Sequence, residues 1–462
     1  MSLFNRNNRP TEKQANARQN RPAQSPSKPK APAASDERLD SLARHFKTRL
    51  LRETDLEKLT NMPSVELRVT LDRLIGRYMA DEQVVISRQD RDRLITRIID
   101  ESVGYGPLEP LLEDPDITEV MVNGPDEIYY EKKGQIHKTD IHFRDEEALR
   151  HVIDRIVAPL GRRVDVSSPM VDARLPDGSR VNAVIPPISL KGSLVSIRKF
   201  RKDPIRMKDL VGFGSLTTDM ATFLSSVVKS KLNVIISGGT GSGKTTLLNA
   251  LANYIPENER IVTIEDMAEL QIPHGHVAGM EARPSNVEGK GEVTIRQLVR
   301  NALRMRPDRI IVGEVRGSEA FDMLQAMNTG HEGSLTTVHS NSPEDAMRRL
   351  EAMVMMSSSD LPPSIIREYL VGAIDFIVQI ARLPDGQRKM VAVSEMQKQE
   401  DGSVGLVELF RFQQTGIDEH GKVQGSHTAT GIIPQCFKRL QAYGASVDSS
   451  IFTPVANKGL SR

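Results

Sequence analysis

The chain has 462 residues, of which 38% are hydrophobic and 27% are charged, and its formal net charge is +1 at pH 7. At about 150 residues per domain this length predicts roughly three folded units. A nearly neutral chain also lacks the positive field that draws dedicated nucleic-acid binders to polyanions.

The single cysteine, Cys436, excludes an intramolecular disulfide framework and a four-cysteine zinc site. We expect no signal peptide, because Met1–Pro10 has no apolar run after its charges. We also expect no transmembrane segment, because the most apolar later stretch, Leu370–Ile380, is too short and carries Asp375 and Gln379.

Two segments precede the first predicted sheet. Residues 1–35 contain seven Lys or Arg, five Pro and one acidic residue, a composition that predicts a disordered basic tail. Such a tail is either simply solvated or weakly attracted to an anionic membrane. In residues 36–103, apolar side chains such as Leu39, Leu42 and Phe46 recur at helical spacing. This pattern predicts a helical bundle, which serves either as a docking module or as a packing unit.

Residues 104–202 are predicted to form an α+β N-terminal domain with an antiparallel sheet. Lys133-Gly134 and Pro176-Asp177-Gly178 are hairpin turns between short apolar runs. Residues 203–214 are the expected linker. The expected elements are strands over 120–122, 128–131, 135–139, 172–175 and 180–185, and a helix over 146–157.

From residue 215 to 462 the pattern indicates an α/β domain. Continuous apolar strands alternate with helices until about Met356, which predicts a parallel sheet covered on both faces. A hairpin around Pro384-Asp385-Gly386 and a less regular, strand-rich tail follow. The expected elements are strands over 232–237, 261–265, 309–313 and 334–339, and helices over 244–253, 294–305, 319–328, 342–356 and 363–373.

One segment, Gly238–Thr245, matches the phosphate-binding pattern G-x-x-x-x-G-K-[ST]. Its glycines permit positive φ, so that backbone amides converge on phosphates, while Lys244 reaches the β/γ oxygens and the Thr245 hydroxyl suits Mg²⁺. It follows an apolar strand and opens a helix, whose N-terminus also attracts anions. We predict that ATP and Mg²⁺ bind to a loop composed of Gly238, Gly239, Thr240, Gly241, Ser242, Gly243, Lys244, Thr245 and Thr246.

Hydrolysis also requires a carboxylate that orients or deprotonates water. Two predicted strands end in acids, since one delivers Glu265 and the other delivers Glu314 one residue past Gly313. Gly313 stands where many P-loop ATPases have a metal-binding Asp. The sequence therefore leaves open how Glu265 and Glu314 divide the general-base role and a contact with Mg²⁺ through water. A helix cap or a surface ion pair is the structural alternative for each.

Histidines and arginines complete the candidate set. His331 and His339 bracket one predicted strand, where a histidine can donate to the γ-phosphate, although a structural role is equally consistent with the pattern. Arg174 and Arg180 flank a hairpin turn, and Arg198 precedes the linker. A guanidinium fork suits phosphoryl oxygens when a domain closes, and a solvated hairpin arginine is the alternative.

Taken together, these segments resemble the secretion ATPase superfamily, which contains the motors of type II and type IV secretion and of pilus assembly. The matching segments are the Walker A at 238–245, an acidic box at 263–266 with Glu269, the Walker B at 309–314 and a His box at 330–339. The segments 288–309 and 172–180 are similar to the CpaF/TadA-type ATPase of the tight-adherence (Tad/Flp) pilus.

The resemblance implies a P-loop NTPase with a RecA-like parallel sheet. It also implies a homo-oligomeric ring, normally a hexamer, at the cytoplasmic face of the inner membrane, where ATP hydrolysis would drive polytopic platform proteins that assemble or withdraw a pilus. The implied site residues are Glu265 and Glu314 as catalytic acids, Arg174, Arg180 and Arg198 as phosphate-facing arginines, and His331 and His339 in the His box.

Three other functions stay open. A type IV secretion traffic ATPase would export protein or DNA–protein substrates with the same chemistry. A nucleic-acid translocase predicts DNA-stimulated turnover, but a neutral chain without Trp offers little for base stacking, so we expect no dedicated nucleic-acid binding. A scaffold gated by nucleotide would bind ATP without efficient hydrolysis, which the two candidate carboxylates disfavour.

Overall fold

The computed structural model describes residues 34–54, 62, 64–102, 104–201, 203–285, 289–357, 361–398, 404–445 and 447–454. Residues 1–33 of the predicted tail lie outside the described residues, while Ala34 and Ser35 belong to the first helix. The chain divides into two compact units between Glu113 and Asp114. The 3-10 helix η1 (Gly106–Leu108) and helix α5 (Glu109–Glu113) therefore fall in the first unit rather than with the sheet that follows.

Three amphipathic helices build the core of the first unit, as their apolar spacing predicts. They are α1 (Ala34–Glu53), α3 (Ser64–Asp81) and α4 (Arg88–Ser102). The Ser87 hydroxyl accepts a hydrogen bond from the Asp90 amide at 3.0 Å and so caps α4. The buried residues between the helices are Leu39, Ala43, Phe46, Leu50, Leu67, Leu71, Ile75, Tyr78, Leu94, Ile95 and Ile98.

The second unit begins with an antiparallel sheet of six strands in the order β3-β2-β1-β6-β5-β4. Both predicted hairpins are present, with Lys133, Gly134 and Gly178 at positive φ in their turns. Strand β6 was not predicted, yet it lies in the middle of the sheet. The elements are β1 (Ile117–Asn123), β2 (Ile128–Lys132), β3 (Gln135–Lys138), α6 (Glu146–Val157), η2 (Ala158–Leu160), β4 (Met170–Arg174), β5 (Arg180–Val184) and β6 (Leu194–Arg198).

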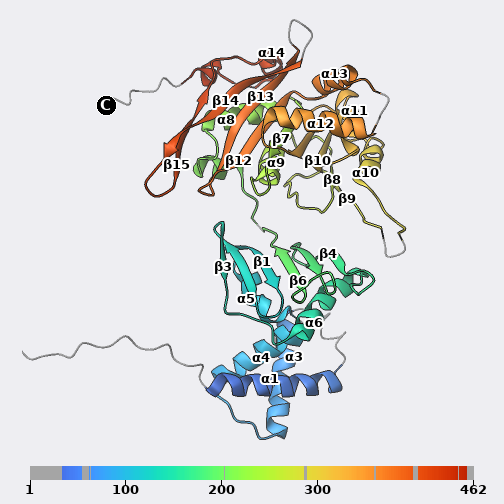
Figure 1. Cartoon of the computed structure of the whole chain (residues 1–462), viewed down its shortest axis with the longest axis vertical. Helices are drawn as coiled ribbons and strands as arrows, with labels where there is room; N and C mark the ends of the chain where they lie inside the picture. The colour runs from blue at the N-terminus through green and yellow to red at the C-terminus, as the bar shows by residue number, and fades with distance from the viewer. Residues whose placement is uncertain are drawn as a thin grey trace, which may run out of the picture. The chain divides into compact units, whose positions relative to one another are not determined.

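The rest of this unit contains a nine-stranded sheet in the order β15-β14-β13-β12-β7-β11-β10-β8-β9 (Figure 1). The six strands from β12 to β9 run parallel, and β13 to β15 continue the sheet antiparallel. The strands are β7 (Val234–Gly238), β8 (Ile261–Glu265), β9 (Val277–Glu281), β10 (Arg309–Val315), β11 (Leu335–His339), β12 (Phe376–Arg382), β13 (Arg388–Lys398), β14 (Val404–Ile417) and β15 (Val423–Ala429).

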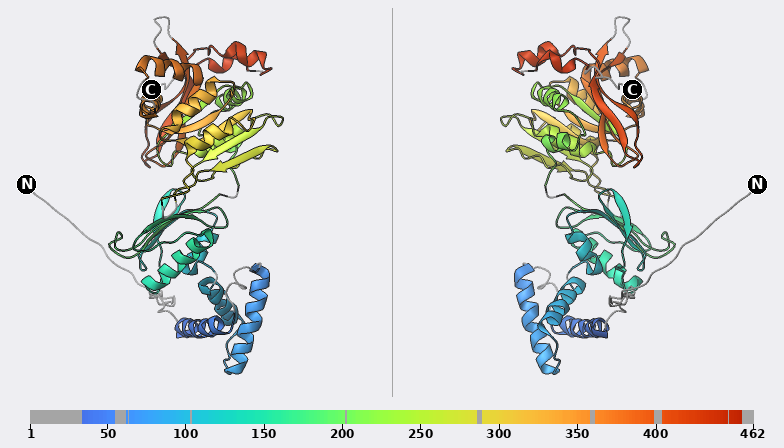
Figure 2. Two further views of the ribbon diagram at one scale, coloured as in Figure 1. Left: turned by 90° about the vertical axis from the view of Figure 1, so that its right-hand side faces the viewer. Right: turned by 90° about the vertical axis from the view of Figure 1, so that its left-hand side faces the viewer.

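Helices cover both faces of this sheet, which confirms the predicted α/β architecture (Figure 2). One apolar core contains buried residues of α7 (Met207–Gly212), α8 (Thr218–Lys229), α9 (Lys244–Ala252), α14 (Phe437–Ala442) and η3 (Ser449–Phe452). The other lies against α10 (Ile295–Ala302), α11 (Glu319–Asn328), α12 (Pro343–Ser357) and α13 (Pro363–Ala373). Strand β9 was not predicted, and neither was the parallel pairing of β12 with β7.

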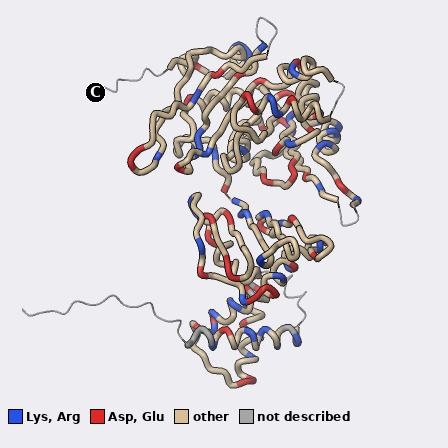
Figure 3. The backbone as a smooth tube through the Cα atoms, viewed as in Figure 1, with Lys and Arg blue, Asp and Glu red and all other residues tan. Residues whose placement is uncertain are grey.

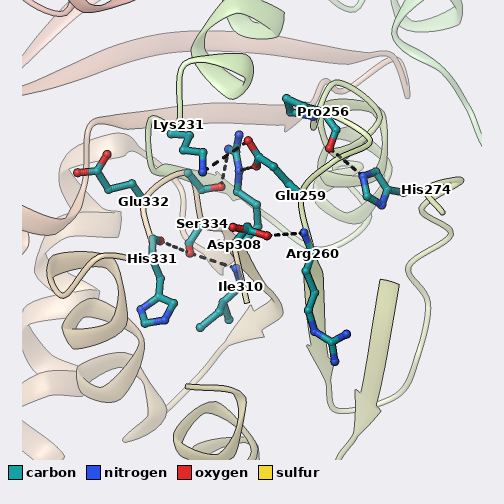
Figure 4. Close-up of polar contacts among 12 residues, drawn as sticks. Lys231, Pro256, Glu259, Arg260, His274, Asp308, Ile310, His331, Glu332 and Ser334 are labelled. Carbon is teal, nitrogen blue, oxygen red and sulfur yellow. Dashed lines mark hydrogen bonds and ion pairs between the residues drawn. The ribbon is translucent and has the colours of Figure 1, made fainter. Parts of the chain in front are cut away.

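A buried polar network joins the amino ends of neighbouring strands in this sheet. Arg309, which is fully buried, donates through Nε to Glu259 at 2.5 Å and through Nη1 to the Gly333 carbonyl at 3.1 Å. The Ser334 amide donates to the Asn233 side chain at 2.9 Å. Figure 4 shows Glu259 and Ser334 in this network. Because Glu259 precedes β8 and Gly333 precedes β11, Arg309 joins the starts of β8, β10 and β11.

Positive and negative residues are interspersed over the described parts of the chain, in agreement with the net charge of +1 (Figure 3). In the described ranges, no helix is both long and apolar enough to cross a membrane.

Candidate functional site

The phosphate-loop motif connects β7 to α9, as its sequence context predicts. All five residues of β7 are buried, and the loop ends at Gly243, the residue that precedes the first turn of α9. Gly241 and Gly243 have φ of +67° and +100°, values that side chains other than glycine rarely adopt. A Cβ on Gly238 would lie 2.5 Å from the Ile380 carbonyl oxygen on the neighbouring strand. The loop thus curls tightly and presents backbone amides at a helix N-terminus, which suits an anion.

Lys244 is the first residue of α9 and directly follows the last glycine of the loop. Its ammonium donates to the Gly239 carbonyl at 3.0 Å, and the Ser242 hydroxyl donates to the same oxygen at 2.9 Å. Burial lowers the pKa of Lys244, and the nearby carboxylate of Glu314 opposes this effect. The loop therefore holds a partly desolvated cation whose hydrogen-bond partner is a neutral carbonyl, and a phosphate would offer it a charged partner.

Glu265 ends β8 and is only 5% exposed. Its Oε2 accepts hydrogen bonds from the amides of Glu269 at 2.7 Å and Leu270 at 2.9 Å. Burial raises the pKa of Glu265 to about 7, although these two amides act in the opposite direction. A carboxyl group with a pKa near neutrality is suited to accept a proton from water.

The glycine that departs from the common Walker B pattern lies directly beside Glu265. A Cβ on Gly313 would stand 3.0 Å from the Glu265 Cγ, which is closer than side chains normally approach. The Thr337 hydroxyl donates to the Gly313 carbonyl at 2.8 Å and holds the backbone there. The space that a metal-binding Asp would need at position 313 is therefore filled by the side chain of Glu265.

Glu314 follows at an irregularity in β10. The pairing of β10 with β11 shifts between Val312 and Val315, so the strand departs from its regular alternation where Glu314 lies. The Glu314 carboxylate forms an ion pair with Arg316 at 2.7 Å, and Arg316 also approaches Asp266 at 3.6 Å. Arg316 was not among the predicted site residues, and its position two residues after Glu314 was the available signal.

The structure separates the two candidate histidines. His339 ends β11 in register with Gly238, and burial followed by the charge of Lys244 lowers its pKa. His331 precedes the start of the same strand, at the opposite edge of the sheet, where its carbonyl accepts from Ser334 at 2.8 Å (Figure 4). Of the two, only His339 lies near the phosphate loop.

The arginines of the six-stranded sheet are also divided. Arg180 and Arg198 are direct neighbours across β5 and β6, and their Nη1 atoms lie 2.6 Å and 3.9 Å from the Glu269 carboxylate. Arg174, in contrast, pairs with Glu281 of β9 at 3.1 Å. Arg180 and Arg198 therefore approach the acidic segment after β8, while Arg174 approaches its edge.

These groups share one cavity of about 210 Å³. Of the predicted site residues, five do not line it: Arg174, Gly238, Gly239, Ser242 and His331. Six further residues do: Asp266, Met267, Glu269, Gly313, Arg316 and Thr337. Its lining contains Arg180, Arg198, Thr240, Gly241, Gly243, Lys244, Thr245, Thr246, Glu265, Asp266, Met267, Glu269, Gly313, Glu314, Arg316, Thr337 and His339. An adjoining cavity of about 140 Å³ shares Arg180, Thr245 and Glu269 and adds the apolar side chains of Phe200, Pro204 and Ile205.

The residues present fit a metal ion that is held mainly by a nucleotide. Among the described residues, no group of three or more His, Cys, Asp or Glu side chains could hold a metal by itself. The Thr245 hydroxyl and the carboxylates of Glu265 and Glu314 line the same cavity as the loop. This donor set, one hydroxyl with one or two carboxylates, suits Mg²⁺ bound together with phosphates.

Comparison with known proteins gives one family. Residues 101–431 match the family described as type II/IV secretion system protein. A Mycobacterium tuberculosis protein whose name refers to conjugal transfer is 39% identical over 325 residues, which make up 69% of this chain and 92% of that protein. The type IV secretion system protein VirB11 of Brucella suis is 34% identical over 301 residues, which make up 59% of this chain and 83% of that protein.

Two solved structures are also similar. The Brucella suis VirB11 ATPase in complex with sulphate is 33% identical, covers 62% of this chain and 91% of its own, and has a TM-score of 0.35. The pilus retraction motor PilT with bound ADP is 17% identical, covers 73% of this chain and 86% of its own, and has a TM-score of 0.46.

Proposed function

Because this chain belongs to the family of type II/IV secretion system proteins, we propose that it is an ATPase that hydrolyses Mg-ATP to drive a secretion or pilus machine. One observation carries the proposal. A glycine loop, Lys244 and two carboxylates at or near strand ends, Glu265 and Glu314, line a single cavity. This is the combination of groups that phosphoryl transfer to water requires.

Each group has a defined task in this proposal. The loop amides and Lys244 bind the phosphates, and Glu265, with its raised pKa, accepts the proton of the attacking water. Glu314 orients that water or the metal, and Arg180 and Arg198 stabilise the charge that develops on the γ-phosphoryl group.

The Thr245 hydroxyl, with Glu265 and Glu314 through water, would hold Mg²⁺, which neutralises phosphate charge when bound. The apolar wall of Phe200, Pro204 and Ile205 suits the base of the nucleotide.

We further propose that the protein works as a homo-oligomeric ring at the cytoplasmic face of the inner membrane. Within the family, the segments 172–180 and 288–309 favour a motor of the tight-adherence pilus that acts on polytopic platform proteins. The 39% identity to a protein named for conjugal transfer and the 34% identity to VirB11 favour the second candidate, a type IV secretion traffic ATPase. Both candidates require the same hydrolytic site.

Steady-state hydrolysis of Mg-ATP by the full chain tests the proposal. We expect turnover in the wild type and a loss of about 100-fold or more in Lys244→Ala and in Glu314→Ala, because both remove groups that face the reacting phosphate. Arg411→Gln, which changes an exposed arginine on β14, is the control and should keep the wild-type rate.

Two results would overturn the assignment. Hydrolysis that persists in both Lys244→Ala and Glu314→Ala would mean that the cavity is not the catalytic site. Strong stimulation by added DNA would favour a nucleic-acid translocase over a protein-secretion motor.

A further inference from the structure

Two arginines face each other next to the phosphate loop. Arg382 ends β12, Arg388 begins β13, and the two are direct partners in the antiparallel register. Like charges placed opposite each other across strands are destabilising. Partial desolvation and then repulsion by Arg382 lower the pKa of Arg388. Among the described residues, neither arginine has a carboxylate within ion-pair distance, so something other than charge pairing must hold them.

Each guanidinium instead donates to the carbonyl of a glycine. Arg388 donates through Nε to the Gly241 carbonyl in the phosphate loop at 2.9 Å. Arg382 donates through Nη2 to the Gly134 carbonyl in the β2–β3 turn at 3.1 Å. Neither side chain lines the cavity of the candidate site. Arg388 is thus attached to the outside of the loop whose inner surface carries Lys244.

The contact with Gly241 determines how the next amide points. A trans peptide is planar, so the carbonyl of one residue and the N–H of the following residue point in opposite directions. Gly241 has a φ of +67° and no side chain, so the backbone at this position can rotate more freely than at other residues. With the Gly241 carbonyl held by Arg388, the Ser242 N–H points into the loop, toward the Gly239 carbonyl at 3.4 Å. Lys244 donates to the same carbonyl oxygen.

We propose that Arg388 is a positioning residue of the phosphate loop, which holds the Gly241 carbonyl outward so that the Ser242 amide is presented to the phosphates. This inference rests on the proposed nucleotide site and deepens it. Arg382 supplies the matched comparison, because it carries the same charge at the same level of the hairpin but makes no hydrogen bond to the loop.

Equilibrium binding of Mg-ADP to the full chain tests the proposal, with thermal unfolding measured in the absence of nucleotide. We expect Arg388→Gln to bind Mg-ADP about tenfold more weakly, the effect of one hydrogen bond made by a charged group. Arg388→Lys retains a donor and should stay within about threefold of the wild type. Arg382→Gln removes an equal charge and should stay within about twofold, and because both arginines are exposed, the melting temperatures should hardly change.

The outcomes are distinguishable. Wild-type affinity in Arg388→Gln, or equal losses in Arg388→Gln and Arg382→Gln, would overturn the positioning role, since the second result would be an effect of charge alone. If Arg388→Gln lowered the melting temperature strongly, Arg388→Lys would decide, and a tenfold loss there would also overturn it. Absence of Mg-ADP binding by the wild type would overturn the proposed function itself.

Discussion

At the scale of single residues, the pair formed by Glu265 and Gly313 explains the unusual acidic strand. The sequence leaves open which glutamate takes the place of the missing Asp. In the structure, Glu265 reaches across from β8 and approaches the Cα of Gly313, where a Cβ would stand 3.0 Å from its Cγ. Two carboxylates on neighbouring strands are thereby brought to one cavity, and the more buried one has its pKa raised to about 7.

The raised pKa of Glu265 makes folding stability depend on pH. Between about pH 4.5 and pH 7 the folded protein holds this proton more tightly than the unfolded chain does, so the free energy of unfolding falls as the pH rises. Glu265→Gln keeps an acceptor for the two amides and removes the titration. We expect the free energy of unfolding of the variant, relative to that of the wild type, to be higher at pH 8 than at pH 5, by about 3 kcal/mol at most. Urea unfolding at both pH values measures this difference.

Asp375 is a second buried carboxyl group that contributes to the pH dependence of stability. Burial raises its pKa to about 6, which adds a fall in stability with rising pH over a lower range. The contribution is the same in both proteins, so it cancels in the comparison. An equal pH dependence of the wild type and Glu265→Gln would contradict the assignment of a raised pKa to Glu265.

At the scale of elements, the parallel strands carry reactive groups at one end and are tied together at the other. Glu265, Glu314 and His339 lie at or near the carboxyl ends of β8, β10 and β11. Arg309 joins the amino ends of the same three strands through Glu259 and the Gly333 carbonyl. The His-box glycine at 333 is therefore a structural requirement, because a Cβ there would lie 1.9 Å from the Arg309 Nη1.

Gly333→Ala should destabilise the protein by about 3 kcal/mol or more, since it forces a fully buried arginine away from its carboxylate. Gly330→Ala is a matched control, because Gly330 also has a positive φ, of +97°, but its added Cβ would meet nothing within 4 Å. That variant should cost only about 1–2 kcal/mol of backbone strain. Equal shifts of the urea midpoint in the two variants would show that the contact with Arg309 is unimportant.

At the scale of the whole second unit, two sheets contribute to one site. The nine-stranded sheet supplies the phosphate loop and the acids, while β5 and β6 of the six-stranded sheet supply Arg180 and Arg198. Glu269 receives both arginines and lies four residues after Glu265. The contact that joins the sheets is thus made next to the candidate base.

Arg180→Ala should lower kcat by about 100-fold and leave the affinity for Mg-ADP nearly unchanged, because a donor to developing charge acts mainly in the transition state. Arg174→Ala should have a much smaller effect on kcat, since Arg174 pairs with Glu281 and does not line the cavity. Steady-state kinetics and Mg-ADP binding check both variants. A wild-type kcat in Arg180→Ala, or similar losses in the two variants, would remove Arg180 from the proposed mechanism.

Much of the fold could be predicted from the sequence, because periodicity and turn residues act over short distances. Helices over 146–157 and 319–328 and the strand over 261–265 have the bounds that their patterns predict. Two of the three failures depend on partners far along the chain, and the third strand lacks a pattern of its own. Strand β6 lies between β1 and β5, the parallel place of β12 depends on β7, and β9 is a half-exposed edge strand without a continuous apolar run.

For the site, the sequence alone determined the position of the phosphate-loop motif, because its glycines, lysine and hydroxyl are adjacent and need no distant partner to be recognised. It also identified Glu265 and Glu314 as acids at or near the carboxyl ends of strands. Only the tertiary structure decided which candidates meet: Arg180, Arg198 and His339 line the cavity, while Arg174 and His331 lie elsewhere. The physical reason is that sequence pattern specifies the face and the end of an element, whereas strand order and register decide which ends become neighbours.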